Sequence, residues 1–65
     1  MKRSALDFYI AEQRACVASC LRMAETRYTR SRPGLSEVFK ADAARHQARL
    51  DEALAQRAQR REDAA

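Results

Sequence analysis

The residues of this chain best suited to chemistry are two cysteines, Cys16 and Cys20, and a single histidine, His46. Thiolates and imidazoles are ligands of zinc, and a thiolate beside an imidazole can act as a nucleophile with its base. On a helix, however, residues four apart point to the same side, and their parallel side chains are poorly placed for a disulfide. Two cysteines are also only half of a zinc site, which His46 or a second chain would have to complete.

We therefore interpret both cysteines as packed thiols, because small, soft side chains let two helices approach closely at a dimer seam. Catalysis by a cysteine would need a glycine-rich turn for the oxyanion and a pocket for the substrate, which 65 residues with one glycine do not provide. His46 is expected in the core or at its edge, near Asp42. The sequence predicts no enzyme activity, no metal and no cofactor, with a zinc site or an intermolecular disulfide as lesser alternatives.

A group of arginines around one tyrosine is the second candidate site. The net charge is +4, and residues 1–34 hold seven basic and three acidic residues, whereas residues 35–65 hold six of each. Arginine and tyrosine often carry binding energy at protein interfaces, and arginine also contacts phosphates. A solvated charged face is the plainer interpretation of the same pattern. The predicted partner-binding residues are Phe8, Arg22, Arg27, Tyr28, Arg30 and Arg32.

The elements expected to position these residues are helices. Ala, Arg, Glu, Gln and Leu dominate the composition while Gly and Pro are scarce, which is typical of helical proteins. The strongest interruption is Ser31-Arg32-Pro33-Gly34, in which proline disfavours the helical region for the residue before it. The sequence predicts a single all-α domain, an antiparallel two-helix hairpin. Its first helix covers about residues 4–29 with Ser4 as the N-cap, its turn residues 30–34, and its second helix about residues 35–60, before a frayed tail.

Apolar residues recur at helical spacing in both segments, as expected for an αα-hairpin. The first apolar stripe is wider than one neighbouring helix can cover. Fourteen residues of the chain are alanine, and a chain of this size buries only about 60% of its surface. We therefore expect a homodimer in which two hairpins form a four-helix bundle. The expected core and dimer residues are Leu6, Ile10, Gln13, Val17, Cys20, Leu21, Leu35, Phe39, His46, Leu50 and Leu54.

Gln13 is a polar member of this set, and two interpretations of it stay open. A buried polar residue in a helix seam can fix register and oligomeric state. Alternatively, its side chain reaches the edge of the seam and stays hydrated.

The expected location is the cytoplasm, or the host cytoplasm for a phage-encoded protein. No apolar run is long enough to span a bilayer, and no signal-peptide core follows Met1-Lys2-Arg3. Arginine outnumbers lysine eleven to two and alanine is abundant, which is typical of a GC-rich bacterial or phage genome.

Two resemblances concern the layout of the chain. Equal helices around Ser31-Arg32-Pro33-Gly34, with small residues in the seam, resemble the Rop-type hairpins, which dimerise into four-helix bundles and bind RNA. The size and the stretch Met23-Ala24-Glu25-Thr26-Arg27-Tyr28 through Arg32-Pro33-Gly34-Leu35-Ser36-Glu37 resemble small helical phage inhibitors of host regulators. The quorum-sensing anti-activators and the anti-CRISPR proteins are of this type. No diagnostic motif defines the group, and the basic charge departs from the acidic DNA mimics among anti-CRISPR proteins.

These patterns together predict a non-enzymatic homodimer that captures and inhibits a host protein such as a transcriptional regulator. The resemblance to the phage inhibitors implies that the protein is phage-encoded. A Rop-like dimer that binds nucleic acid is the alternative, and a small structural or chaperone-like subunit is a third interpretation. The expected partners are a second copy of the chain and a host protein, with no membrane.

Overall fold

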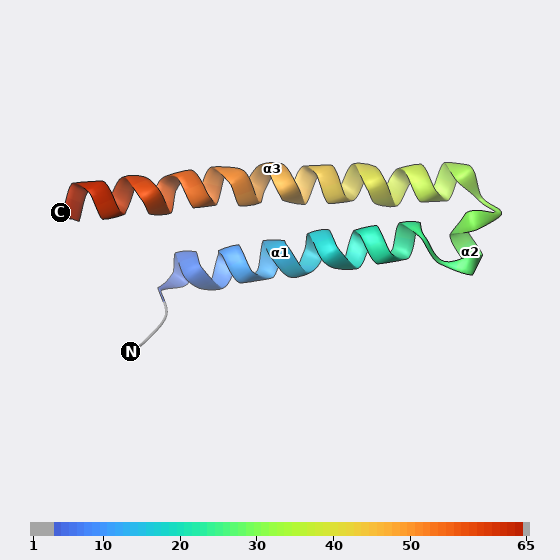
Figure 1. Cartoon of the computed structure of the whole chain (residues 1–65), viewed down its shortest axis with the longest axis horizontal. Coiled ribbons are helices and arrows are strands. Elements are labelled where there is room, and N and C mark those ends of the chain that lie inside the picture. Colours follow the sequence, from blue (N-terminus) through green and yellow to red (C-terminus); the bar gives the residue numbers. More distant parts are fainter. Residues whose placement is uncertain (1–3, 65) are drawn as a thin grey trace.

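The computed structural model describes residues 4–64, and it is entirely helical apart from short connections. Helix α1 spans Ala5–Ala24, α2 spans Arg27–Arg30 and α3 spans Pro33–Ala64. Helices α1 and α3 run antiparallel side by side, and α2 lies within the turn that joins them (Figure 1). The predicted all-α class is confirmed. Residues 1–3 and Ala65, the last residue of the expected tail, lie outside the described range.

Helix α1 begins as the sequence predicts but ends earlier. The Ser4 hydroxyl accepts a hydrogen bond of 3.1 Å from the Asp7 amide, which satisfies one of the unpaired N–H groups at the helix start. The helix ends at Ala24 instead of near residue 29, because the backbone of Thr26 is extended, with φ −79° and ψ 164°. Thr26 then serves as the N-cap of α2.

A network of two threonine hydroxyls holds α2 in place. The Thr29 amide donates to the Thr26 hydroxyl over 3.2 Å, and the Thr29 hydroxyl donates to the Thr26 carbonyl over 3.0 Å. Thr29 is only 1% exposed, so its polar atoms rely on these bonds. Thr29 is not among the residues predicted for the core, although the spacing Thr26-x-x-Thr29 fits a helix cap.

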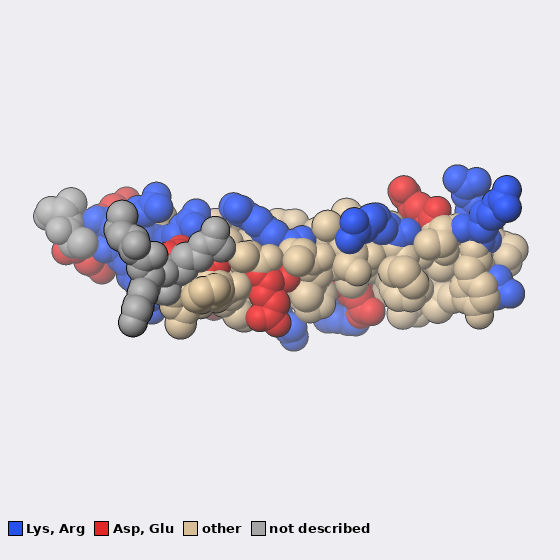
Figure 2. Space-filling view, turned by 90° about the horizontal axis from the view of Figure 1, so that it is seen from below, with Lys and Arg blue, Asp and Glu red and all other residues tan. Residues whose placement is uncertain are grey.

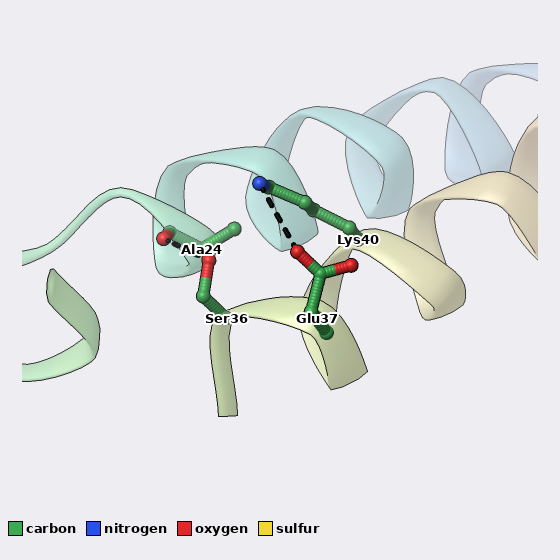
Figure 3. Close-up of polar contacts among 4 residues, drawn as sticks. All are labelled: Ala24, Ser36, Glu37 and Lys40. Atoms are coloured by element: carbon green, nitrogen blue, oxygen red, sulfur yellow. Dashed lines mark hydrogen bonds and ion pairs between the residues drawn. The ribbon is translucent and has the colours of Figure 1, made fainter. Parts of the chain in front are cut away.

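Helix α3 is longer than predicted at both ends. It starts at Pro33 instead of near residue 35, because proline at the first helical position lacks only an N–H that would be unpaired there anyway. The Ser36 hydroxyl donates to the Ala24 carbonyl over 2.9 Å and so joins the start of α3 to the end of α1 (Figure 3). At the other end α3 stays helical through Ala64, and its last turns extend past the start of α1 (Figure 1).

The core lies between α1 and α3 and is small. Ile10, Leu50 and Ala53 are buried together, with Leu6 and Leu54 packed against them. The molecule measures 51 × 21 × 11 Å, so it is about one helix thick. Several large apolar side chains consequently stay open to solvent. They are Phe8, Tyr9, Leu21, Met23, Tyr28 and Val38.

Candidate functional site

The predicted basic cluster lies at the turn, where five side chains form what we call the turn surface. Its members are Arg22, Arg27, Tyr28, Arg30 and Arg32. The last turn of α1 supplies the first of them, and α2 with the connection after it supplies the others. All five are exposed, Tyr28 by 61%. Viewed from the α1 side, Lys and Arg side chains gather at the turn end of the molecule (Figure 2).

Tyr28 and Arg32 form the most ordered part of the turn surface. The guanidinium carbon of Arg32 lies 3.8 Å from the centroid of the Tyr28 ring, in a cation–π contact. Nη1 of Arg32 also donates to the Tyr28 carbonyl over 2.6 Å and to the Ser31 hydroxyl over 3.2 Å. Both side chains are therefore held in place although they are exposed, which lowers the entropy lost when a partner binds them.

The charge of the turn surface is not neutralised by ion pairs within the described chain. Among residues 4–64 the ion pairs are Lys40 with Glu37 (3.5 Å; Figure 3), Arg45 with Asp42, and Arg57 with Asp7 (3.5 Å). None of them includes an arginine of the turn surface. These guanidinium groups can therefore meet an acidic partner without breaking an ion pair first.

Phe8, the sixth predicted partner-binding residue, lies apart from the turn surface. It is 61% exposed, but it lies in the first turn of α1, whereas Arg22 lies in the last. At a rise of 1.5 Å per residue these two positions are about 21 Å apart along the helix. A partner of ordinary size could reach both, yet they form no single cluster.

Gln13 and His46 form a polar contact across the seam. Nδ1 of His46 lies 2.7 Å from Oε1 of Gln13, and Gln13 is only 5% exposed. Of the two interpretations of Gln13, the structure supports the buried one. His46 does lie at the edge of the core, but its hydrogen-bond partner is Gln13 and not Asp42, which pairs with Arg45.

The other expected core residues occupy the seam to different degrees. Ile10 and Leu50 are buried, while six are half-buried: Leu6, Val17, Cys20, Leu35, Phe39 and Leu54. Leu21 is 48% exposed, so it is not a core residue of the single hairpin. Leu21 lies at the edge of the apolar stripe of α1, and this stripe is too wide for α3 alone to cover.

Cys16 and Cys20 are free thiols, and each is half-buried. They lie one turn apart on α1. Within residues 4–64, no three side chains of the His, Cys, Asp and Glu types come together as metal ligands. One hairpin thus presents a pair of thiols, as the spacing predicted.

None of the helices in residues 4–64 is both long enough and apolar enough to cross a membrane. Comparisons with protein-family models, with curated proteins and with solved structures find no match to this chain.

Proposed function

We propose that this chain is a homodimeric binding protein without catalytic activity, which captures and inhibits a host protein such as a transcriptional regulator. In this proposal the protein is phage-encoded and acts in the host cytoplasm. The turn surface makes the contact with the partner. The single observation that carries the proposal is the contact between the exposed side chains of Tyr28 and Arg32. The arginines around them form no ion pair within residues 4–64.

A protein partner fits this surface because tyrosine and arginine are among the residue types enriched at the energetic centres of protein interfaces. The Tyr28 ring offers an apolar anchor, and the guanidinium groups around it suit carboxylates, which they can bind in a bidentate manner. The partner surface should therefore be acidic, with an apolar recess for the ring. Dimerisation is supported by the large apolar side chains that one hairpin leaves open.

The proposal is tested by capture from a nuclease-treated lysate with the tagged protein, comparing two double variants. Arg27→Ala/Arg30→Ala removes two charges from the turn surface. Arg49→Ala/Arg60→Ala removes two exposed arginines from α3, outside the turn surface, and serves as the matched control. We expect capture to weaken about tenfold or more in the first variant only, with helicity unchanged in both. Equal capture by both variants would contradict the proposal.

Nucleic acid is the second candidate partner, because an arginine stacked on an exposed tyrosine also suits phosphates and unpaired bases. This alternative predicts a steep loss of affinity with salt, with a slope of roughly one for each phosphate contacted. Titration of a mixed duplex and of a structured RNA at low and physiological salt separates the two. Tight binding at physiological salt that requires Arg27 and Arg30 would favour nucleic acid.

A further inference from the structure

Three side chains that contain sulfur lie on one flank of α1, which we call the sulfur flank. Its members are Cys16, Cys20 and Met23. At about 100° per residue, their positions fall within about 60° of one another around the helix axis. Both cysteines are free and half-buried, and Met23 is 44% exposed. None of the three belongs to the turn surface.

The spacing of the two cysteines suits an ion better than a disulfide. Helical residues four apart have Cβ atoms about 5–6 Å apart, whereas a disulfide needs about 3.8 Å. An intrahelical disulfide would therefore distort α1. A metal–thiolate bond of about 2.3 Å on each side lets one ion bridge two sulfur atoms that are up to about 4.6 Å apart. The helix thus keeps Cys16 and Cys20 as thiols and spaces them for a single ion.

The partial burial of the thiols also suits an ion site. Both cysteines lie at the edge of the seam between α1 and α3, half-buried and not enclosed. Packing in the seam excludes water from one side of such a site, and the exposed side leaves a path for the ion to enter. A thiolate has to be partly accessible in this way in order to react or to bind a metal.

Met23 can supply a third ligand from the turn of helix after Cys20. Long side chains on a helix lean toward its N-terminus, so the side chain of Met23 is directed toward Cys20 by the direction of α1. Methionine has three rotatable bonds, and its thioether is a soft, neutral ligand. Because Met23 is 44% exposed, packing in the seam does not prevent its side chain from turning toward an ion.

The ligand set indicates which metal it would hold. Structural zinc sites are closed by four ligands. Within residues 4–64 no three side chains of the His, Cys, Asp and Glu types come together, and Nδ1 of His46 is already in contact with Gln13. Thiolate and thioether ligands together select Cu(I), a soft ion that is stable with only two or three ligands.

We propose that Cys16, Cys20 and Met23 form a Cu(I) site within a single hairpin. When the ion binds, each thiol releases its proton to the solvent and its thiolate bonds to copper, while the thioether of Met23 donates a lone pair. Copper remains Cu(I) throughout, so no oxidant or reductant is consumed. This activity goes beyond the proposed capture of a protein partner, and it uses other residues, so each can fail without the other.

The site is tested by anaerobic titration of the reduced protein with Cu(I), in competition with the chromophoric Cu(I) chelator bicinchoninate. We expect one ion per chain. Loss of an outer-shell partner costs a metal site about 10–100-fold in affinity, so removal of both thiolates in Cys16→Ser/Cys20→Ser should cost more than about 100-fold. Met23→Leu keeps an apolar side chain and should cost about tenfold. Ala15→Ser/Ala18→Ser, at exposed positions of α1, is the matched control and should bind like the wild type.

X-ray absorption at the copper edge identifies the ligands. We expect three sulfur neighbours in the wild type and two in Met23→Leu. A nitrogen neighbour would bring in His46 and overturn this ligand set, and so would an unchanged affinity in Met23→Leu. Half an ion per chain would place copper between two chains and overturn the site within one hairpin.

The site itself would be overturned if the wild type yields all its copper to the chelator, or if the double serine variant binds Cu(I) as tightly as the wild type. Circular dichroism of each variant shows whether the helices are retained. Cys16→Ala/Cys20→Ala repeats the titration if the serines reduce helicity, because alanine favours helix.

Discussion

The seam between α1 and α3 and the turn around α2 are held together by different forces. Apolar packing dominates the seam, where Ile10, Leu50 and Ala53 are buried. Two polar pairs also cross between the helices, Gln13 with His46 and Asp7 with Arg57. Local hydrogen bonds dominate the turn, where the threonine network and the bond from Ser36 to Ala24 fix the backbone. The turn can therefore hold its shape while its large side chains stay exposed. Packing in the seam thus stabilises the hairpin, whereas the partner binding that we propose uses the turn.

The largest effect is expected in the seam, from Leu50→Ala. Leu50 is 6% exposed, and truncating a buried leucine lowers the free energy of unfolding by about 2–5 kcal/mol. For a chain of this size such a loss approaches the whole stability, so the thermal transition followed by circular dichroism should fall sharply or disappear. Val38→Ala truncates a side chain that is 54% exposed and should change little. A similar loss in both variants would contradict the assignment of stability to the seam.

A smaller effect is expected from the polar pair in the same seam. Gln13→Ala leaves the imidazole of His46 without its partner, and this should lower the free energy of unfolding by about 1–3 kcal/mol. A double-mutant cycle with His46→Ala isolates the pair, and we expect a coupling of about 0.5–1.5 kcal/mol in urea denaturation. Strictly additive losses would show that the contact does not stabilise the hairpin.

In the turn, Thr26→Ala removes the N-cap of α2. The expected loss is about 1 kcal/mol of unfolding free energy, because the Thr29 amide loses its acceptor. Thr26→Ser keeps the hydroxyl and is the matched control. Since α2 carries Tyr28, capture of the partner should weaken in Thr26→Ala by more than the loss of folded protein explains. Normal capture would mean that the cap does not order the turn surface.

Helix boundaries show how far the sequence can predict this fold. Leu6, Ile10 and Leu50 follow the helical period, and Ser4 caps α1 as a local signal, so these features were predictable. The end of α1 at Ala24 was missed, because the helix-forming composition continues to residue 29 and the capping pattern of Thr26 with Thr29 was not taken into account. Periodicity also placed Leu21 on the apolar stripe correctly but could not show that α3 leaves it uncovered.

The sequence could predict which residues form the candidate site but not how their side chains are arranged. Arginines around Tyr28 were evident from composition and spacing. The stacking of Arg32 on the Tyr28 ring was not, because α2 ends at Arg30 and helical spacing no longer fixes where the Arg32 side chain lies. Phe8 stays a predicted partner-binding residue, although the length of α1 separates it from the arginines.

The smallest effect is expected at the far end of the hairpin, where α1 starts. The hydrogen bond from the Ser4 hydroxyl is the main reason why the pKa of Asp7 is lowered, with the Ser4 backbone and Arg57 as lesser causes. A carboxyl with a lowered pKa stabilises the fold above its unfolded pKa of about 3.9, and that contribution is lost as pH falls through the folded value. Asp7→Asn should therefore show a slightly weaker decline of stability below about pH 4 in urea titrations. Arg57→Ala should retain most of the decline of stability at low pH, because Arg57 is a lesser cause of the lowered pKa. A steeper decline in Asp7→Asn than in the wild type would contradict the lowered pKa of Asp7.

The most direct test of the separation between seam and turn is the double variant Tyr28→Ala/Arg32→Ala, measured for stability and for capture on the same preparation. Both side chains are exposed, so the free energy of unfolding in urea should change by less than about 0.5 kcal/mol. Capture from nuclease-treated lysate should nevertheless weaken by about tenfold or more, because the ordered centre of the turn surface is gone. Unchanged capture, or a loss of capture that matches a loss of stability, would contradict the assignment of binding to the turn.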